Sequence, residues 1–109
     1  MLHTKRLHIR NFKSDDLQRL FEYRNNKECK KYQEWKDTSR EYLKNFIEIN
    51  SKRDLNNDEI QYAIALKETD ELVGDLYISK KRKTITLGFT ISPSFQRKGY
   101  MSEVLTALI

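Results

Sequence analysis

The chain has 109 residues, a length that favours one domain with a single modest core. Hydrophobic residues make up 38% of the sequence and charged residues 34%, and an aromatic content of 11% excludes an intrinsically disordered chain. The formal net charge of +5, from 21 Lys and Arg against 16 Asp and Glu, suits an anionic partner. A soluble surface with surplus lysine explains the same charge more simply.

The cysteine count and the apolar runs exclude two further classes. Cys29 is the only cysteine, so an intramolecular disulfide cannot form. No stretch approaches the length of a membrane span, and residues 1–13 contain no apolar run of signal-peptide length. We therefore expect a cytoplasmic protein without a membrane partner.

The first elements expected are a strand and a helix. Alternating apolar residues predict a strand near residues 6–10. Apolar residues at helical spacing follow, and they predict a helix that stops near residues 25–26. Ser14 or Asp15 can cap this helix, because either side chain can accept hydrogen bonds from free amides of the first turn.

A second helix is expected before the middle of the chain. Thr38 and Glu41 have the spacing of a capping box, which marks the start of a helix. The apolar stripe that follows predicts that this helix ends near residues 51–53, and residues 56–58 have the composition of a turn.

Three strands and a last helix complete the expected order. Residues 62–66, 72–78 and 84–91 alternate in the manner of strands, with a charged hairpin tip at residues 80–83. Pro93 ends the last strand by removing a hydrogen-bond donor. The apolar stripe of the final helix comprises Met101, Val104, Leu105 and Leu108.

The segment at residues 96–101 is the strongest functional signal. It reads Gln-Arg-Lys-Gly-Tyr-Met and directly precedes the last helix. Unpaired amides at a helix start, together with a curled loop, form an anion site. Gly99 leaves room for a close phosphate, while Arg97 and Lys98 add positive charge. The segment therefore predicts a pyrophosphate cradle, although an ordinary basic turn has the same composition.

This segment resembles the coenzyme loop of the GNAT superfamily of N-acetyltransferases, and most of all the branch that includes the ribosomal-protein N-terminal acetyltransferases. The family loop reads Gln or Arg, two variable residues, Gly, one variable residue, then Gly or Ala. Residues 96–100 match this pattern, and Met101 departs from its last position. Further matches follow the order of the family at residues 4–7, 9–10, 23–25, 35, 38–39, 72–74, 87–89 and 102–103.

The resemblance implies an α/β fold of the α+β type. The expected sheet is mixed and largely antiparallel, with helices on both faces and the order β-α-α-β-β-β-α. The last helix stops at Ile109 in the middle of its apolar stripe. We therefore expect residues 1–109 to form a single N-acetyltransferase-like domain that lacks the C-terminal strands and helix of the family.

The resemblance also implies the coenzyme, acetyl-CoA, and a direct attack of an acceptor amine on its thioester. The pantetheine arm is expected along the strand at residues 89–91, and the pyrophosphate at the loop that follows. The residues expected to bind the coenzyme are Phe89, Thr90, Ile91, Gln96, Arg97, Lys98, Gly99, Tyr100, Met101 and Ser102.

The sequence indicates the acceptor site and the catalytic groups less clearly than the coenzyme loop. Tyr32 and Trp35 could line the acceptor site, or could instead pack between helix and sheet. The family often has a carboxylate two residues before the glycine of the last strand, and that position is Thr86 here. The residue that protonates the thiolate lies beyond the last helix in the family. No catalytic residue is therefore assigned.

Metal and nucleic-acid sites are not expected. His3 and His8 lack metal-ligand spacing with any cysteine or carboxylate cluster. The basic run at residues 80–83 has no interleaved aromatic residue, so solvated charges at a hairpin tip explain it.

The leading hypothesis is thus an enzyme that acetylates a primary amine, either a protein N-terminus or a small molecule. The alternative is a truncated, non-catalytic acyl-CoA-binding protein, and net charge alone supports a third class, a basic nucleic-acid-binding domain. An open apolar strand edge at residues 84–91 further predicts a homodimer or larger oligomer.

Overall fold

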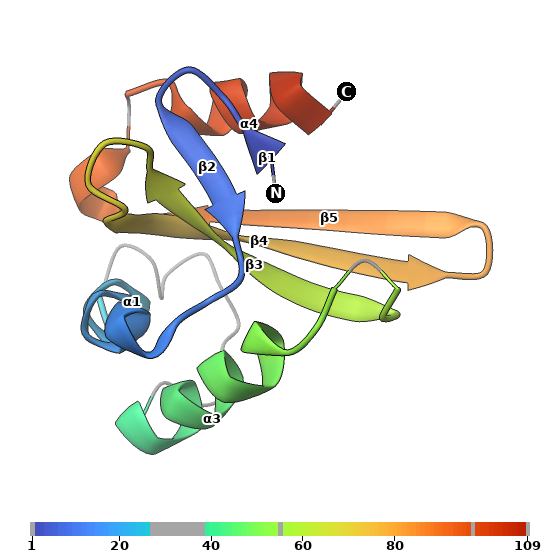
Figure 1. Cartoon of the computed structure of the whole chain (residues 1–109), viewed down its shortest axis with the longest axis horizontal. Coiled ribbons are helices and arrows are strands. Elements are labelled where there is room, and N and C mark those ends of the chain that lie inside the picture. The colour runs from blue at the N-terminus through green and yellow to red at the C-terminus, as the bar shows by residue number, and fades with distance from the viewer. Residues whose placement is uncertain (1, 27–38, 55, 97, 109) are drawn as a thin grey trace.

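The computed structural model describes residues 2–26, 39–54, 56–96 and 98–108. Its centre is an antiparallel sheet in the order β1-β2-β3-β4-β5, with helices on both faces (Figure 1). The strands are β1 (Leu2–His3), β2 (Leu7–Arg10), β3 (Glu59–Leu66), β4 (Leu72–Lys81) and β5 (Thr84–Ile91). The predicted element order is confirmed, with the two-residue β1 as an addition.

The helices lie on opposite sides of this sheet (Figure 1). The 3₁₀ helix η1 (Ser14–Asp16), α1 (Leu17–Arg24) and α3 (Arg40–Ser51) cover one face. The 3₁₀ helix η2 (Pro93–Phe95) follows β5 and leads to α4 (Tyr100–Leu108), which covers the other face.

Both predicted helix caps are wrong by one or two residues. The N-cap of α3 is Ser39, whose hydroxyl accepts a hydrogen bond from the Tyr42 amide at 3.2 Å. Thr38 lies outside the described residues. At the earlier helix, the Asp16 carboxylate accepts from the Lys13 amide at 2.8 Å, because a 3₁₀ turn precedes α1.

The core is divided into two clusters by the sheet. The cluster beneath α4 contains Leu7, Ile9, Ile60, Tyr62, Ile64, Val73, Leu76, Ile91 and Val104. The cluster beneath α1 and α3 contains Phe12, Leu20, Tyr23, Leu43, Ile47, Ala63 and Leu72. The helices therefore pack apolar side chains against both faces of the same sheet, although Leu105 of the predicted α4 stripe is 38% exposed.

A bulge in β4 breaks the alternation predicted for that strand. Ile64 pairs with Gly74 and Ala65 pairs with Leu72, so Val73 is the extra residue. Strict alternation predicts Leu72 on the same face as Leu76. The bulge instead places Leu72 in the α1 and α3 cluster and Val73 in the α4 cluster.

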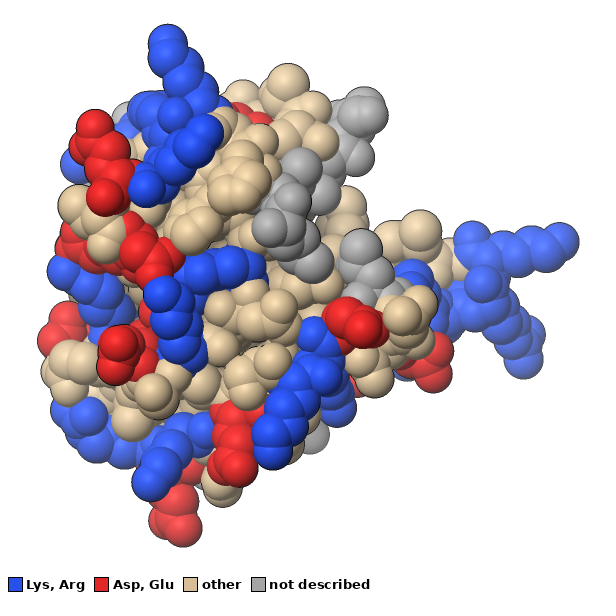
Figure 2. All heavy atoms as spheres, in the orientation of Figure 1, with Lys and Arg blue, Asp and Glu red and all other residues tan. Residues whose placement is uncertain are grey.

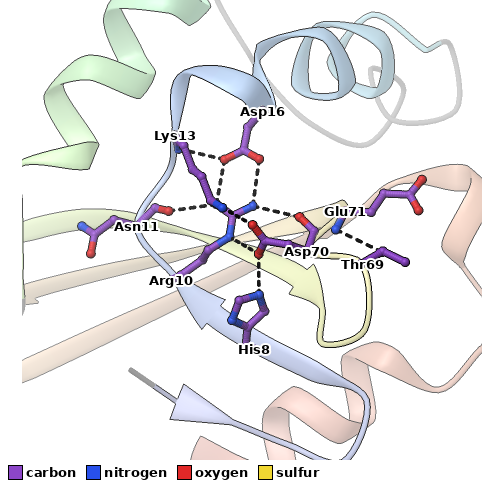
Figure 3. Close-up of polar contacts among 8 residues, drawn as sticks. All are labelled: His8, Arg10, Asn11, Lys13, Asp16, Thr69, Asp70 and Glu71. Carbon is purple, nitrogen blue, oxygen red and sulfur yellow. Dashed lines mark hydrogen bonds and ion pairs between the residues drawn. The ribbon is translucent and has the colours of Figure 1, made fainter.

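A polar network joins β2, η1 and the turn between β3 and β4 (Figure 3). Asp70 Oδ1 lies 2.6 Å from His8 Nε2 and 2.7 Å from Arg10 Nε, and Lys13 Nζ contacts the other carboxylate oxygen. The Arg10 guanidinium also donates two bonds to Asp16, at 2.8 and 2.9 Å. Arg10 thus bridges two carboxylates from different elements.

Partial burial alone raises the pKa of Asp70, but the hydrogen bonds from Lys13, Arg10 and His8 outweigh it. They hold the pKa of this carboxyl well below its usual range. Its contribution to stability is therefore complete above the unfolded-state pKa of about 3.9 and is lost as the pH falls through the lower, folded-state value.

We expect Asp70→Asn to reduce the free energy of unfolding at pH 7 by roughly 1 kcal/mol, since the carboxylate is 35% exposed and partly screened. Asn tolerates the positive φ of 63° at this position, so the change removes mainly charge. Urea titrations at pH 7 and pH 3 measure the effect. The difference from the parent should shrink at pH 3, whereas Glu68→Gln in the same turn should change little at either pH.

Candidate functional site

The loop between β5 and α4 is held by bonds from its own residues and from β4. The Ser92 amide donates to the Val73 carbonyl at 2.7 Å, which turns the chain away from β5. The Phe95 amide then donates to the Ser92 carbonyl at 2.8 Å. Gln96 donates through Nε2 to the Ile91 carbonyl at 3.1 Å. The Gln96 side chain therefore stabilises the loop.

Gly99 turns the backbone into α4. Its φ is +79°, in the left-handed region that L side chains rarely adopt. A Cβ at this position would lie 3.4 Å from Arg6 Nη2. The positive φ is thus one reason for a glycine at this position. The room that a glycine leaves for a phosphate, which the sequence analysis predicts, is a second reason.

The first turn of α4 presents donors. The amides of Tyr100, Met101 and Ser102 have no acceptor within the helix, because they belong to its first turn. None of them donates to another described residue. These amides and the positive end of the helix dipole suit an anion.

Arg6, in the β1–β2 loop directly before β2, contacts the loop between β5 and α4 from a distant part of the sequence. Its Nη1 donates to the Lys98 carbonyl at 2.9 Å, and its Nε lies 2.7 Å from Glu103 Oε1. Its guanidinium also stacks 4.6 Å from the centre of the Tyr100 ring. Sequence reasoning missed this role, because nothing in the local pattern links residues more than 90 positions apart.

Glu103 is the acidic partner in this clamp. It accepts from Arg6 and from the Thr4 hydroxyl. Burial alone raises the pKa of Glu103, but the hydrogen bonds from Thr4 and Arg6 outweigh this effect. The pKa of this carboxyl therefore lies below its usual range. The first turn of α4 is thereby fastened to the β1–β2 loop.

The structure brings most of the predicted coenzyme residues to one end of β5. Phe89 contacts the core beneath α4, Thr90 faces the opposite side, and Ile91 is buried. Lys98 Nζ lies 5.4 Å from the centre of the Phe95 ring. Met101 packs on the core and Ser102 is exposed. The predicted residues Arg97, Tyr32 and Trp35 lie outside the described residues.

A cavity of about 280 Å³ opens on the α1 and α3 face of β4 and β5. It is lined by Arg24, Gln61, Asp75, Tyr77, Gly88, Phe89 and Thr90. Asp75 pairs directly with Thr90 across the two strands. The cavity therefore adjoins the part of β5 where the pantetheine arm is expected.

Asp75 is the one carboxylate among the lining residues, and it is 4% exposed. The Tyr23 hydroxyl donates to its Oδ2, and Arg24 Nη2 lies 3.5 Å from the same oxygen. Sequence reasoning missed this residue. The signal was available: Asp75 interrupts an otherwise apolar strand, and a charged residue there needs partners or a function.

The described part of the chain contains no group of three or more His, Cys, Asp or Glu side chains that could hold a metal ion. No helix in it has both the length and the apolar character needed to cross a membrane.

Comparison with known proteins gives the family. Residues 6–109 match the model of the acetyltransferase (GNAT) domain. An uncharacterized N-acetyltransferase of Bacillus subtilis, YnaD, is 30% identical over 108 residues, which are 97% of this chain and 61% of that protein. The chain therefore belongs to the GNAT acetyltransferase family.

Two solved structures are also similar. A GNAT-family acetyltransferase from Bacillus anthracis superposes with a TM-score of 0.81 at 25% identity, covering 98% of this chain and 62% of that one. A Vibrio cholerae protein described as a ribosomal-protein-serine acetyltransferase gives a TM-score of 0.79 at 26% identity, covering 98% and 63%. The fold is thus that of GNAT proteins, and the chain spans about three-fifths of the length of these relatives.

The contact between β4 and β5 beside the cavity leaves no room for a side chain at Gly74. A Cβ there would lie 2.1 Å from the Thr90 carbonyl oxygen. We expect Gly74→Ala to reduce the free energy of unfolding by about 2–3 kcal/mol through overpacking. Gly88→Ala is the matched control, since its Cβ would be 3.5 Å from the Tyr77 Cβ, and it should change stability by less than about 1 kcal/mol. Equal effects in urea denaturation would contradict the close approach.

Proposed function

We propose that the protein is an acetyl-CoA-dependent N-acetyltransferase that transfers the acetyl group to a primary amine by direct attack. The observation that carries this proposal is the β5–α4 unit, in which Gly99 turns the chain into a helix whose first amides donate to no described residue and suit an anion. Membership of the GNAT family supports acetyl-CoA as the ligand, with its pyrophosphate group as the anion that binds at this helix start.

The pantetheine arm is proposed to lie along the outer edge of β5. In the described sheet β5 has β4 on one side only, so its other edge has backbone groups available to a ligand. The predicted residues Phe89, Thr90 and Ile91 form the end of this strand before the loop. A strand amide on the outer edge could stabilise the oxyanion that forms on the thioester carbonyl.

The acceptor is proposed to be a primary amine on a protein N-terminus or a small molecule. The description of the Vibrio cholerae relative as a ribosomal-protein-serine acetyltransferase favours a protein N-terminus. A non-catalytic acyl-CoA-binding protein remains the second candidate. Amine-dependent release of the CoA thiol separates the two, since the second candidate binds the coenzyme without releasing it.

The charge at the loop, rather than at the β4–β5 hairpin tip, should determine coenzyme affinity. Lysine and arginine side chains project from this tip, well away from the body of the molecule (Figure 2). The eight residues of β5 separate the tip from the loop by about 25 Å, three times the Debye length of roughly 8 Å at physiological salt.

We therefore expect the double change Arg97→Gln and Lys98→Gln to weaken CoA binding at least tenfold. The matched double change Lys81→Gln and Lys83→Gln should alter it less than twofold. Isothermal titration calorimetry measures both. Gly99→Val should also abolish binding, because valine adds bulk and disfavours the positive φ. The reverse ranking of the two double variants would contradict the proposed site.

We also propose a cytoplasmic location and assembly into a homodimer or larger oligomer. The apolar face of β5 supports the assembly, since Ile85 is 66% exposed and Leu87 is 44% exposed at the outer strand of the described sheet.

We expect light scattering during size-exclusion chromatography to give at least twice the mass of one chain. Ile85→Lys with Leu87→Lys should shift the protein toward the monomer, and a monomeric parent at micromolar concentration would contradict the proposal.

A further inference from the structure

We propose that Asp75 is the group that binds the acceptor amine and takes a proton from it. This inference rests on the proposed acetyltransferase function and adds a residue that neither the sequence pattern nor the family loop assigns. It commits the acceptor to a primary amine that reaches the cavity as an ammonium ion.

The placement of Asp75 is the first argument. Its carboxylate lines the 280 Å³ cavity, and the residue is only 4% exposed. Its strand partner is Thr90, on the neighbouring strand, and directly opposed residues in antiparallel strands are about 5 Å apart. A ligand in the cavity would therefore lie within reach of both Asp75 and the end of β5.

The hydrogen bonds of Asp75 are the second argument. Both donors, the Tyr23 hydroxyl and Arg24 Nη2, approach Oδ2. The other oxygen, Oδ1, accepts from no described residue. Oδ1 is not among the fully buried side-chain atoms that lack a partner, so it keeps access to the cavity that Asp75 lines. An ammonium group in the cavity could therefore bind Oδ1 with a charge-assisted hydrogen bond.

Two neighbouring positions on the described strands are less well placed than Asp75. Thr86, where the family often has a carboxylate, is exposed and pairs with Ser79, toward the hairpin tip. Glu59 accepts from the Tyr77 hydroxyl at 2.8 Å and does not line the cavity. Asp75 on the adjacent strand can therefore supply the basic group that Thr86 lacks.

The proposed step balances as follows. The ammonium ion transfers one proton to Asp75, directly or through one water, and becomes a neutral amine. Its nitrogen lone pair attacks the thioester carbonyl carbon, the C–N bond forms, and the C–S bond breaks with its electron pair on sulfur. The nitrogen loses a second proton and the thiolate gains one, so the products are the N-acetylamine, the CoA thiol and one proton released to solvent.

Four chains provide the test: the parent, Asp75→Asn, Tyr23→Phe, and the matched surface control Asp58→Asn. Asp58 is exposed and does not line the cavity. Thermal melts and acetyl-CoA calorimetry check the fold and the coenzyme site of each chain. Ser-Ala-Ala peptide, putrescine, tyramine and glucosamine serve as amine probes in two assays, release of the CoA thiol and NMR titration of the CoA-bound protein.

We expect at least one probe to shift the Asp75 amide resonance of the parent. Asp75→Asn should keep acetyl-CoA affinity within twofold, weaken this amine binding at least tenfold and lower kcat/KM about 100-fold or more. Tyr23→Phe leaves both carboxylate oxygens in place and should lower kcat/KM less than tenfold. Asp58→Asn should match the parent.

Two results would overturn the inference: no amine-dependent shift in the parent with any probe, or amine binding in Asp75→Asn equal to that of the parent. If Asp75→Asn does not fold, the Tyr23→Phe and parent titrations still decide whether the Asp75 resonance responds to amines. A parent that binds amines at Asp75 and acetyl-CoA at its loop but transfers no acetyl group would contradict the proposed function and leave the amine site standing.

Discussion

Val73 is bulged out of the ladder between β3 and β4, and the geometry of the candidate site depends on this one residue. The bulge exposes the Val73 carbonyl to the Ser92 amide, a 2.7 Å bond that marks the point where β5 gives way to the loop. The uninterrupted ladder that starts at the β4–β5 hairpin, with Lys81 opposite Thr84, sets the register in which Gly74 lies against β5 and Asp75 pairs with Thr90. A shift by one residue would turn Asp75 toward the α4 face, away from the cavity.

The end of β5 joins two environments that differ in charge. On the α4 side, the Arg6 clamp fixes a loop and a helix start that favour an anion. On the α1 and α3 side, the cavity contains a buried carboxylate, Asp75, whose Oδ2 is paired with Arg24 and whose Oδ1 accepts from no described residue. This arrangement suits the proposed acyl transfer, in which the thioester of a pyrophosphate-bearing donor and an amine that arrives as an ammonium ion must be held side by side.

Much of the fold was predictable from the sequence, because the strands and helices have clear periods. The strand at residues 84–91 has the same bounds in prediction and structure, since its two faces separate fully into apolar and polar. The caps were not predictable to the residue: Ser39 and Asp16 compete with neighbours of the same chemistry, and local backbone geometry decides among them.

The sequence by itself determined the family, the order of the elements and the candidate phosphate loop, because these depend on residues that are near one another along the chain. Only the tertiary structure decided that Arg6 clamps the loop and that Tyr23 and Arg24 meet Asp75. These contacts join residues from about 50 to more than 90 positions apart. Strand register and helix packing bring them together, and neither leaves a local pattern in the sequence.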